Sequence, residues 1–254
     1  MGMLVVRIIV NAVILALEIA AIAAVVWLGY AHPYWFALAS LVVAVVIGLV
    51  LDERRLVHEY PFYFDAPAPR SLLVLRLVAI GDALVKGVLA GIVALLTFAG
   101  TDLDRRFWVA IVFALAIFAG TSLLRRLRRS FAARPSRWGY FRLAIPLGLV
   151  FSCGLAALAA GGQIKVVGLT DLMRQLVLDI PAEPGIEHVS ELLFGLQQYV
   201  DGIVATLLAT ILPVEWAQIV SLAVSVNVLT GFVAAIYAVV IAEMVATLER
   251  GARL

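Results

Sequence analysis

Long apolar runs separated by short polar connections dominate the chain. Six of these runs reach about the 20 residues that an α-helix needs to cross the hydrocarbon core of a bilayer. They lie near residues 4–30, 34–51, 72–99, 106–124, 142–162 and 217–246. The pattern therefore predicts an all-α polytopic membrane protein with six transmembrane helices.

The segment 163–216 breaks this pattern. It contains seven acidic residues but only Lys165 and Arg174 as basic ones, which suits the extracytoplasmic side. Its stretch 186–213 begins amphipathic and becomes wholly apolar from Gly202. This apolar part is short for a membrane crossing. We expect an extracytoplasmic amphipathic or re-entrant helical segment here. If 186–213 crossed the membrane, the protein would instead have seven transmembrane helices.

Basic residues predict the orientation, because short cytoplasmic loops are rich in Lys and Arg. Four basic residues lie on one side of the predicted helices: Arg105, Arg106, Lys165 and Arg174. Fourteen lie on the other side: Arg7, Arg54, Arg55, Arg70, Arg76, Arg125, Arg126, Arg128, Arg129, Arg134, Arg137, Arg142, Arg250 and Arg253. We therefore place the N-terminus and the C-terminus in the cytoplasm. The five tryptophans lie near predicted helix ends, where indole rings prefer the interface, and support the same boundaries.

These assignments divide the chain into three regions. Residues 1–162 form a five-helix transmembrane region with basic cytoplasmic loops, 163–216 the extracytoplasmic helices, and 217–254 the last transmembrane helix and a cytoplasmic tail. The composition agrees, because 64% of the residues are hydrophobic and only 14% are charged, against about 25% charged in soluble domains. The preference for Arg over Lys, together with abundant Ala, Val and Leu, suggests a bacterial inner membrane protein.

Three ionisable side chains lie inside the predicted helices: Glu18, Asp82 and Lys86. Each costs about 2.5–3.5 kcal/mol at the centre of a membrane helix. Asp82 and Lys86 are four residues apart and can pair on one helix face. Glu18 and Lys86 both lie roughly 20 Å from the starts of their helices, and Asn11 shares the face of Glu18. We therefore predict an intramembrane cluster of Glu18, Asp82, Lys86 and Asn11.

This predicted cluster has two interpretations. It is either an ion or proton relay or substrate-binding point, or an ionic lock that sets the packing of helices. The lock is a common way for membrane proteins to tolerate charge in lipid.

Small residues at four-residue spacing predict close helix packing. They are Ser40, Ala44 and Gly48 on one predicted helix, Gly87 and Gly91 on another, and Gly148 and Ser152 on a third. An Ala-rich composition alone would also produce such a pattern.

A basic patch follows the fourth predicted helix and consists of Arg125, Arg126, Arg128 and Arg129. We expect it to contact anionic lipid headgroups, at about 1 kcal/mol per basic residue. A cytoplasmic protein partner is the alternative, and nothing beyond charge points to nucleic acid.

The sequence contains no Gly-rich phosphate loop and no nucleophile elbow. Its single cysteine, Cys153, cannot form an internal disulfide or a multi-thiolate metal site. We therefore expect a protein that is not an enzyme and holds neither a cofactor nor a metal. The buried charges favour a component of membrane transport, either a small transporter or channel or the membrane subunit of a transport complex. The alternative is a non-catalytic scaffold or assembly subunit, and both imply other membrane subunits or further copies of the chain as partners.

Overall fold

The computed structural model describes residues 2–64, 73–99, 103–131, 142–164 and 226–251, and in addition residues 185, 195, 200, 202–204, 206–213, 216–217 and 219–221. Its long elements are all helices: α1 (Gly2–Ala31), α2 (Pro33–Phe64), α3 (Leu73–Phe98), α4 (Leu103–Phe131), α6 (Ala144–Ala160) and α10 (Thr230–Gly251). A short 3-10 helix, η1 (Val226–Leu229), precedes α10. The described part of the chain contains no strand.

Five segments are long and apolar enough to cross a membrane. They are Ile8–Ala31, Pro33–Leu51, Arg76–Phe98, Leu103–Phe131 and Thr230–Gly251. Helix α6 is also apolar but has only 17 residues. These helices agree with the predicted all-α class and are consistent with a helical membrane protein.

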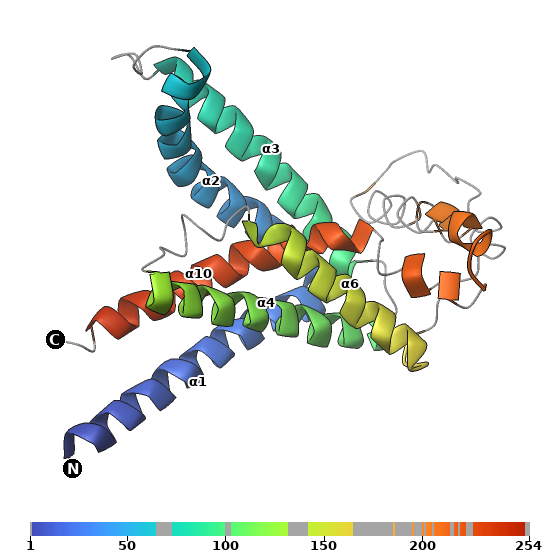
Figure 1. The fold of residues 1–254 in the computed structure, drawn as a ribbon, viewed down its shortest axis with the longest axis horizontal. Helices are drawn as coiled ribbons and strands as arrows, with labels where there is room; N and C mark the ends of the chain where they lie inside the picture. The colour runs from blue at the N-terminus through green and yellow to red at the C-terminus, as the bar shows by residue number, and fades with distance from the viewer. Residues whose placement is uncertain are drawn as a thin grey trace.

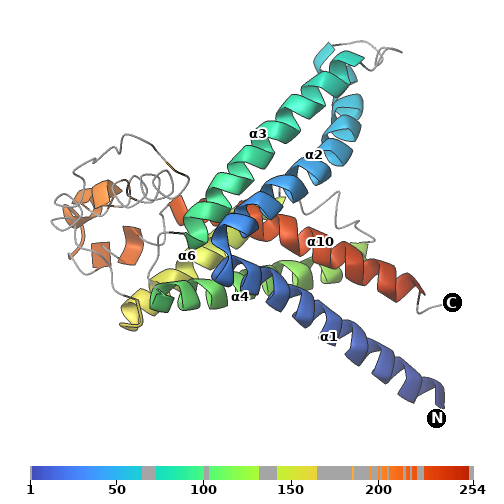
Figure 2. The ribbon, with the colours of Figure 1, turned by 180° about the vertical axis from the view of Figure 1, so that it is seen from behind.

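The helices form two groups that diverge from a common junction (Figures 1 and 2). Helices α1, α4 and α10 lie together, and α6 packs against α4 and α10. Helices α2 and α3 pack along each other as an antiparallel hairpin that leaves this group as a separate arm. The N-terminus and the C-terminus lie at the same end of the molecule, on the side of α1 and α10 (Figure 1).

Aromatic side chains from five helices fill the junction. Phe36 of α2 lies edge-on to Phe98 of α3, with ring centroids 5.1 Å apart, and stacks on Tyr237 of α10 at 5.5 Å. Phe113 of α4 contacts Phe98 at 5.4 Å and Phe151 of α6 at 6.2 Å, both edge-on. Such pairs contribute about 0.5–1.5 kcal/mol each beyond the burial of their area. The arm therefore joins the other helices through a packed aromatic core.

Hydrogen bonds between hydroxyl groups reinforce this junction. The hydroxyls of Ser40 and Tyr237 lie 3.0 Å apart and join α2 to α10. The hydroxyls of Thr97 and Thr230, also 3.0 Å apart, join α3 to the start of α10. Because the surroundings are apolar, each hydroxyl satisfies its hydrogen-bonding capacity within the protein.

Helices α4 and α10 run in the same direction. A Cβ atom on Gly120 would lie 2.8 Å from the Cβ of Ala238. Nearer the ends of the two helices, Arg128 donates to the carbonyl of Ala246 across the same sequence separation of 118 residues. Helix α6 runs in the opposite direction to α4, because Gly120 meets Leu147 while Gly154 meets Val112.

The last helix differs from its prediction of residues 217–246. The continuous α-helix begins at Thr230, directly after the 3-10 turn η1. The reason lies in the contact with α6. The carbonyl of Val228 lies against Gly148, and Gly231 lies against the backbone of Ala144 and Gly148. Both approaches are so close that neither glycine has room for a Cβ atom. The tighter turn brings the backbone of the chain against α6.

The span predicted at 34–51 agrees with the apolar segment Pro33–Leu51, and helix α2 continues beyond it to Phe64. The sequence after Leu51 contains no Gly or Pro before Pro61, so nothing local stops the helix. Most of the predicted amphipathic or re-entrant segment 186–213 lies outside the described residues. The described positions between 202 and 209 are helical, and the chain turns at residues 210–212 before Pro213.

The glycine contact between α6 and α10 gives the first prediction. We expect Gly231→Val to lower the stability of the folded protein by about 1–3 kcal/mol, because the side chain must force the two backbones apart. Gly251→Ala is the control, since a Cβ atom at Gly251 meets no other atom within 4 Å. Thermal unfolding in detergent measures both variants, and equal melting temperatures for the two would contradict this packing.

Candidate functional site

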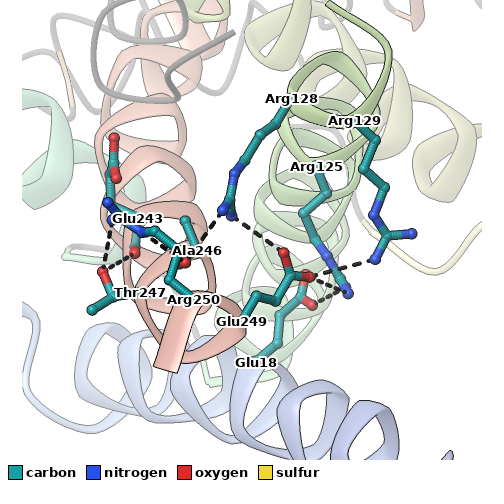
Figure 3. A network of polar contacts seen from close by, with 9 residues as sticks. All are labelled: Glu18, Arg125, Arg128, Arg129, Glu243, Ala246, Thr247, Glu249 and Arg250. Atoms are coloured by element: carbon teal, nitrogen blue, oxygen red, sulfur yellow. Dashed lines mark hydrogen bonds and ion pairs between the residues drawn. The ribbon is translucent and has the colours of Figure 1, made fainter. Parts of the chain in front are cut away.

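Glu18 is the only charged side chain that is fully buried in the described part of the chain. Its Oε2 atom accepts a hydrogen bond of 2.5 Å from Nη1 of Arg125 on α4. Its Oε1 atom is also buried but has no hydrogen-bond partner among the described residues. Arg125 thus supplies the charge partner that holds the carboxylate of Glu18 in an apolar bundle, and this pair ties α1 to α4 (Figure 3).

The two side chains approach each other along the helices. Glu18 lies roughly 20 Å before the end of α1 at Ala31, whereas Arg125 lies roughly 33 Å after the start of α4 at Leu103. Side chains of a helix lean toward its N-terminus, and α1 and α4 run in opposite directions, so Glu18 and Arg125 lean toward each other. The cationic end of α4 therefore reaches a carboxylate that lies deeper in the bundle.

Glu249 in the last turn of α10 extends this pair into a network. Its carboxylate lies 3.6 Å from Arg125, 3.2 Å from Arg128 and 3.4 Å from Arg129. Arg128 also donates to the carbonyl of Ala246 at 3.3 Å, and Arg250 donates to the same carbonyl at 3.2 Å. These arginines satisfy a carbonyl near the C-terminal end of α10, where cations are favoured.

The network joins three helices at one end of the bundle. Figure 3 shows the arginines of α4 reaching toward both carboxylates, one from α1 and one from α10. Arg125 contacts both Glu18 and Glu249 and is the residue that connects all three helices. We call Glu18, Arg125, Arg128, Arg129 and Glu249 the three-helix ion network.

The sequence predicts that Glu18 lies close to Lys86, but the structure does not bring these two side chains together. Lys86 forms its ion pair with Asp82 on the same helix, with Nζ and Oδ2 2.5 Å apart. Glu18 pairs with Arg125 instead, and Asn11 is exposed on α1. The physical reason is that α3 departs with α2 in the separate arm, so equal depth in the membrane does not make the two residues neighbours. The two halves of the predicted cluster therefore lie in different groups of helices.

Three members of the predicted basic patch have partners within the protein. Arg125, Arg128 and Arg129 bind carboxylates of the protein, whereas Arg126 is exposed. Sequence reasoning missed Glu249 as a partner. A signal was present, because an acidic residue in the last turn of the final predicted helix lies on the same side as this patch.

All the small residues expected at helix contacts are buried, namely Ser40, Ala44, Gly48, Gly87, Gly91, Gly148 and Ser152. Gly87 and Gly91 lie against Val45 and Leu41 of α2, where the arm is packed. These contacts are made within one copy of the chain.

The two members of the charged pair on α3 differ in exposure. The side chain of Asp82 is 47% exposed and that of Lys86 is 15% exposed. Both lie inside the span Arg76–Phe98. The described residues contain no group of three or more His, Cys, Asp and Glu side chains that could hold a metal ion.

Comparison of the chain with models of known protein families, with characterised proteins and with solved structures finds no match. Inferences about function therefore rest on the arrangement of these charged groups.

Removal of Arg125 tests the network. We expect Arg125→Met to destabilise the protein by about 3–5 kcal/mol, because it leaves the buried carboxylate of Glu18 without its cation. Glu18→Leu combined with Arg125→Met should recover much of this loss, since neither charge remains.

Arg126→Met is the matched control, because Arg126 is the exposed neighbour of Arg125. Unfolding temperatures in detergent compare the wild-type protein with these three variants. A similar loss for Arg125→Met and Arg126→Met would show that the contact with Glu18 does not stabilise the bundle.

Proposed function

We propose that this protein is a non-catalytic membrane subunit of a larger membrane assembly, and that its α2–α3 arm joins it to that assembly. The observation that carries this proposal is the exposed Asp82–Lys86 pair within the span of α3. Glu18, the fully buried charge of the described bundle, is already paired within the three-helix ion network.

The position of the pair makes lipid an unfavourable neighbour. Asp82 and Lys86 lie roughly 9 Å and 15 Å from the start of the span at Arg76, within a hydrocarbon core about 30 Å thick. Pairing within the helix lowers the cost of each charge, but nearly half of the Asp82 side chain stays exposed. Ionisable groups at such depths face protein or a water-filled path rather than lipid. A neighbouring protein helix would cover this pair.

The directions of the helices support six spans with both termini on one side. If two membrane spans run in the same direction, the chain between them must cross the membrane an odd number of times. Helices α4 and α10 are parallel, and α6 supplies one such crossing. A seventh span within 186–213 would require α10 to run against α4. With the excess of arginine on that side, both termini are proposed to be cytoplasmic.

Cysteine labelling tests this topology. In a chain with Cys153→Ala, a cysteine introduced at Leu254 should react with a thiol reagent that cannot cross the membrane only after the membrane is opened. A cysteine at His32, in the connection between α1 and α2, should react in intact cells and serves as the control. Labelling of position 254 in intact cells would refute the six-span topology.

Extraction in a mild detergent tests the proposal of an assembly. We expect the wild-type protein to migrate well above the mass of one copy. Asp82→Leu combined with Lys86→Leu should migrate as a single copy, because the exposed carboxylate of Asp82, which favours a protein neighbour over lipid, is gone. Arg126→Leu is the control for removal of charge. Wild-type protein that migrates as one copy would contradict the proposed function.

Transport remains a second candidate because the same exposed pair would line a polar path if the partner helix left room for water. Asp82→Asn should then abolish flux while the assembly stays intact, whereas Glu18→Gln should affect stability more than flux. Flux measured in vesicles that contain the intact assembly distinguishes the candidates. Unchanged flux with Asp82→Asn would exclude a relay through α3.

A further inference from the structure

The exposed face of α3 carries a regular seam of side chains. Five exposed residues follow one another at alternating spacings of four and three residues, namely Val78, Asp82, Val85, Leu89 and Ile92. This spacing places them along one side of a helix. It is the spacing by which two helices interlock their side chains along a shared seam, and a single polar residue in such a seam sets register and the number of copies.

The seam is separate from the packing inside the arm. Gly87 and Gly91 occupy the opposite side of α3, where they contact Leu41 and Val45 of α2. Contacts within one copy therefore leave the seam uncovered. Gly81 borders the seam next to Asp82, and a Cβ atom there would meet nothing within 4 Å. The backbone of a neighbouring helix can approach closely at this position.

The charges on this face are complementary to themselves. Lys86 lies one turn after Asp82, and its side chain leans back so that Nζ reaches the height of the Asp82 carboxylate, 2.5 Å away. A second α3 placed alongside, in the same direction and related by a two-fold axis, brings another such pair to the same height. The two pairs then lie at one depth, and their four charges sum to zero.

We propose that α3 binds α3 of a second copy of this chain through the seam Val78–Ile92, about a two-fold axis along the membrane normal. This inference rests on the proposed function and specifies the partner. The second copy covers the exposed Asp82 carboxylate with protein in place of lipid, and its own aliphatic side chains cover those of the seam. A closed pair of this kind uses the same surface on both copies.

Cysteine cross-linking in native membranes tests the pairing. In a chain with Cys153→Ala, copper-catalysed oxidation should convert Val85→Cys to a band of two copies. Leu84→Cys is the matched control, because Leu84 is the adjacent residue and is 50% exposed, against 68% for Val85, but it lies off the seam. We expect no two-copy band from Leu84→Cys. Equal bands from both variants, or none from Val85→Cys, would overturn the pairing.

Charge reversal tests the role of the ion pairs. With Val85→Cys present, Asp82→Lys alone and Lys86→Asp alone should each lose the two-copy band, because four like charges would meet. Expression of both variants together, each with its own tag, should restore a band that contains both tags. If one variant does not accumulate in the membrane, Asp82→Asn replaces it and should weaken the band. Undiminished bands in all single variants would overturn the electrostatic part of the pairing.

These outcomes are distinguishable from failure of the proposed function. A cross-link from Val85→Cys to a different chain would overturn pairing with a second copy and leave the subunit proposal intact. Wild-type protein that migrates as one copy in mild detergent would overturn both.

Discussion

The bundle depends on one constraint, which is that a charge removed from water needs an opposite charge. The contact between Arg125 and Glu18 meets this need. Glu18 is fully buried on α1, and its carboxylate binds the guanidinium of Arg125 on α4. Because Arg125 also contacts Glu249 of α10, the same guanidinium joins three helices. Lipid supplies no hydrophobic force between helices, so such polar contacts and close packing hold them together.

Packing at the other end of the helices provides the second part of this stability. The rings of Phe36, Phe98 and Phe113 meet there, and the hydroxyl of Tyr237 binds that of Ser40. From this junction the α2–α3 arm diverges from the remaining helices (Figure 1). The bundle of α1, α4 and α10 thus pairs its buried carboxylate within itself, whereas the arm presents a charged pair and a regular apolar seam at its surface.

The sequence predicted the positions of helices best where a long apolar run marked them. The apolar runs predicted helices α1, α3 and α6 with boundaries within two residues of those of the structure, whereas α4 continues seven residues past its predicted end at residue 124. The end of α2 and the start of α10 differed. Helix α2 continues past its apolar run because no Gly or Pro stops it before Pro61, and the start of α10 depended on the contact of Val228 with Gly148 of another helix. The pairing of Asp82 with Lys86 was predictable because both lie one turn apart on the same helix.

The sequence by itself determined that this is an all-helical chain suited to a membrane, that its charges within the spans are few, and that Asp82 can neutralise Lys86. Those properties depend on composition and on spacing along single helices. Only the tertiary structure decided that Glu18 binds Arg125, that Arg128 and Arg129 bind Glu249, and that α3 leaves the bundle with α2. The depth of a residue can be counted along its own helix, but its neighbours depend on which helices pack together and in which direction.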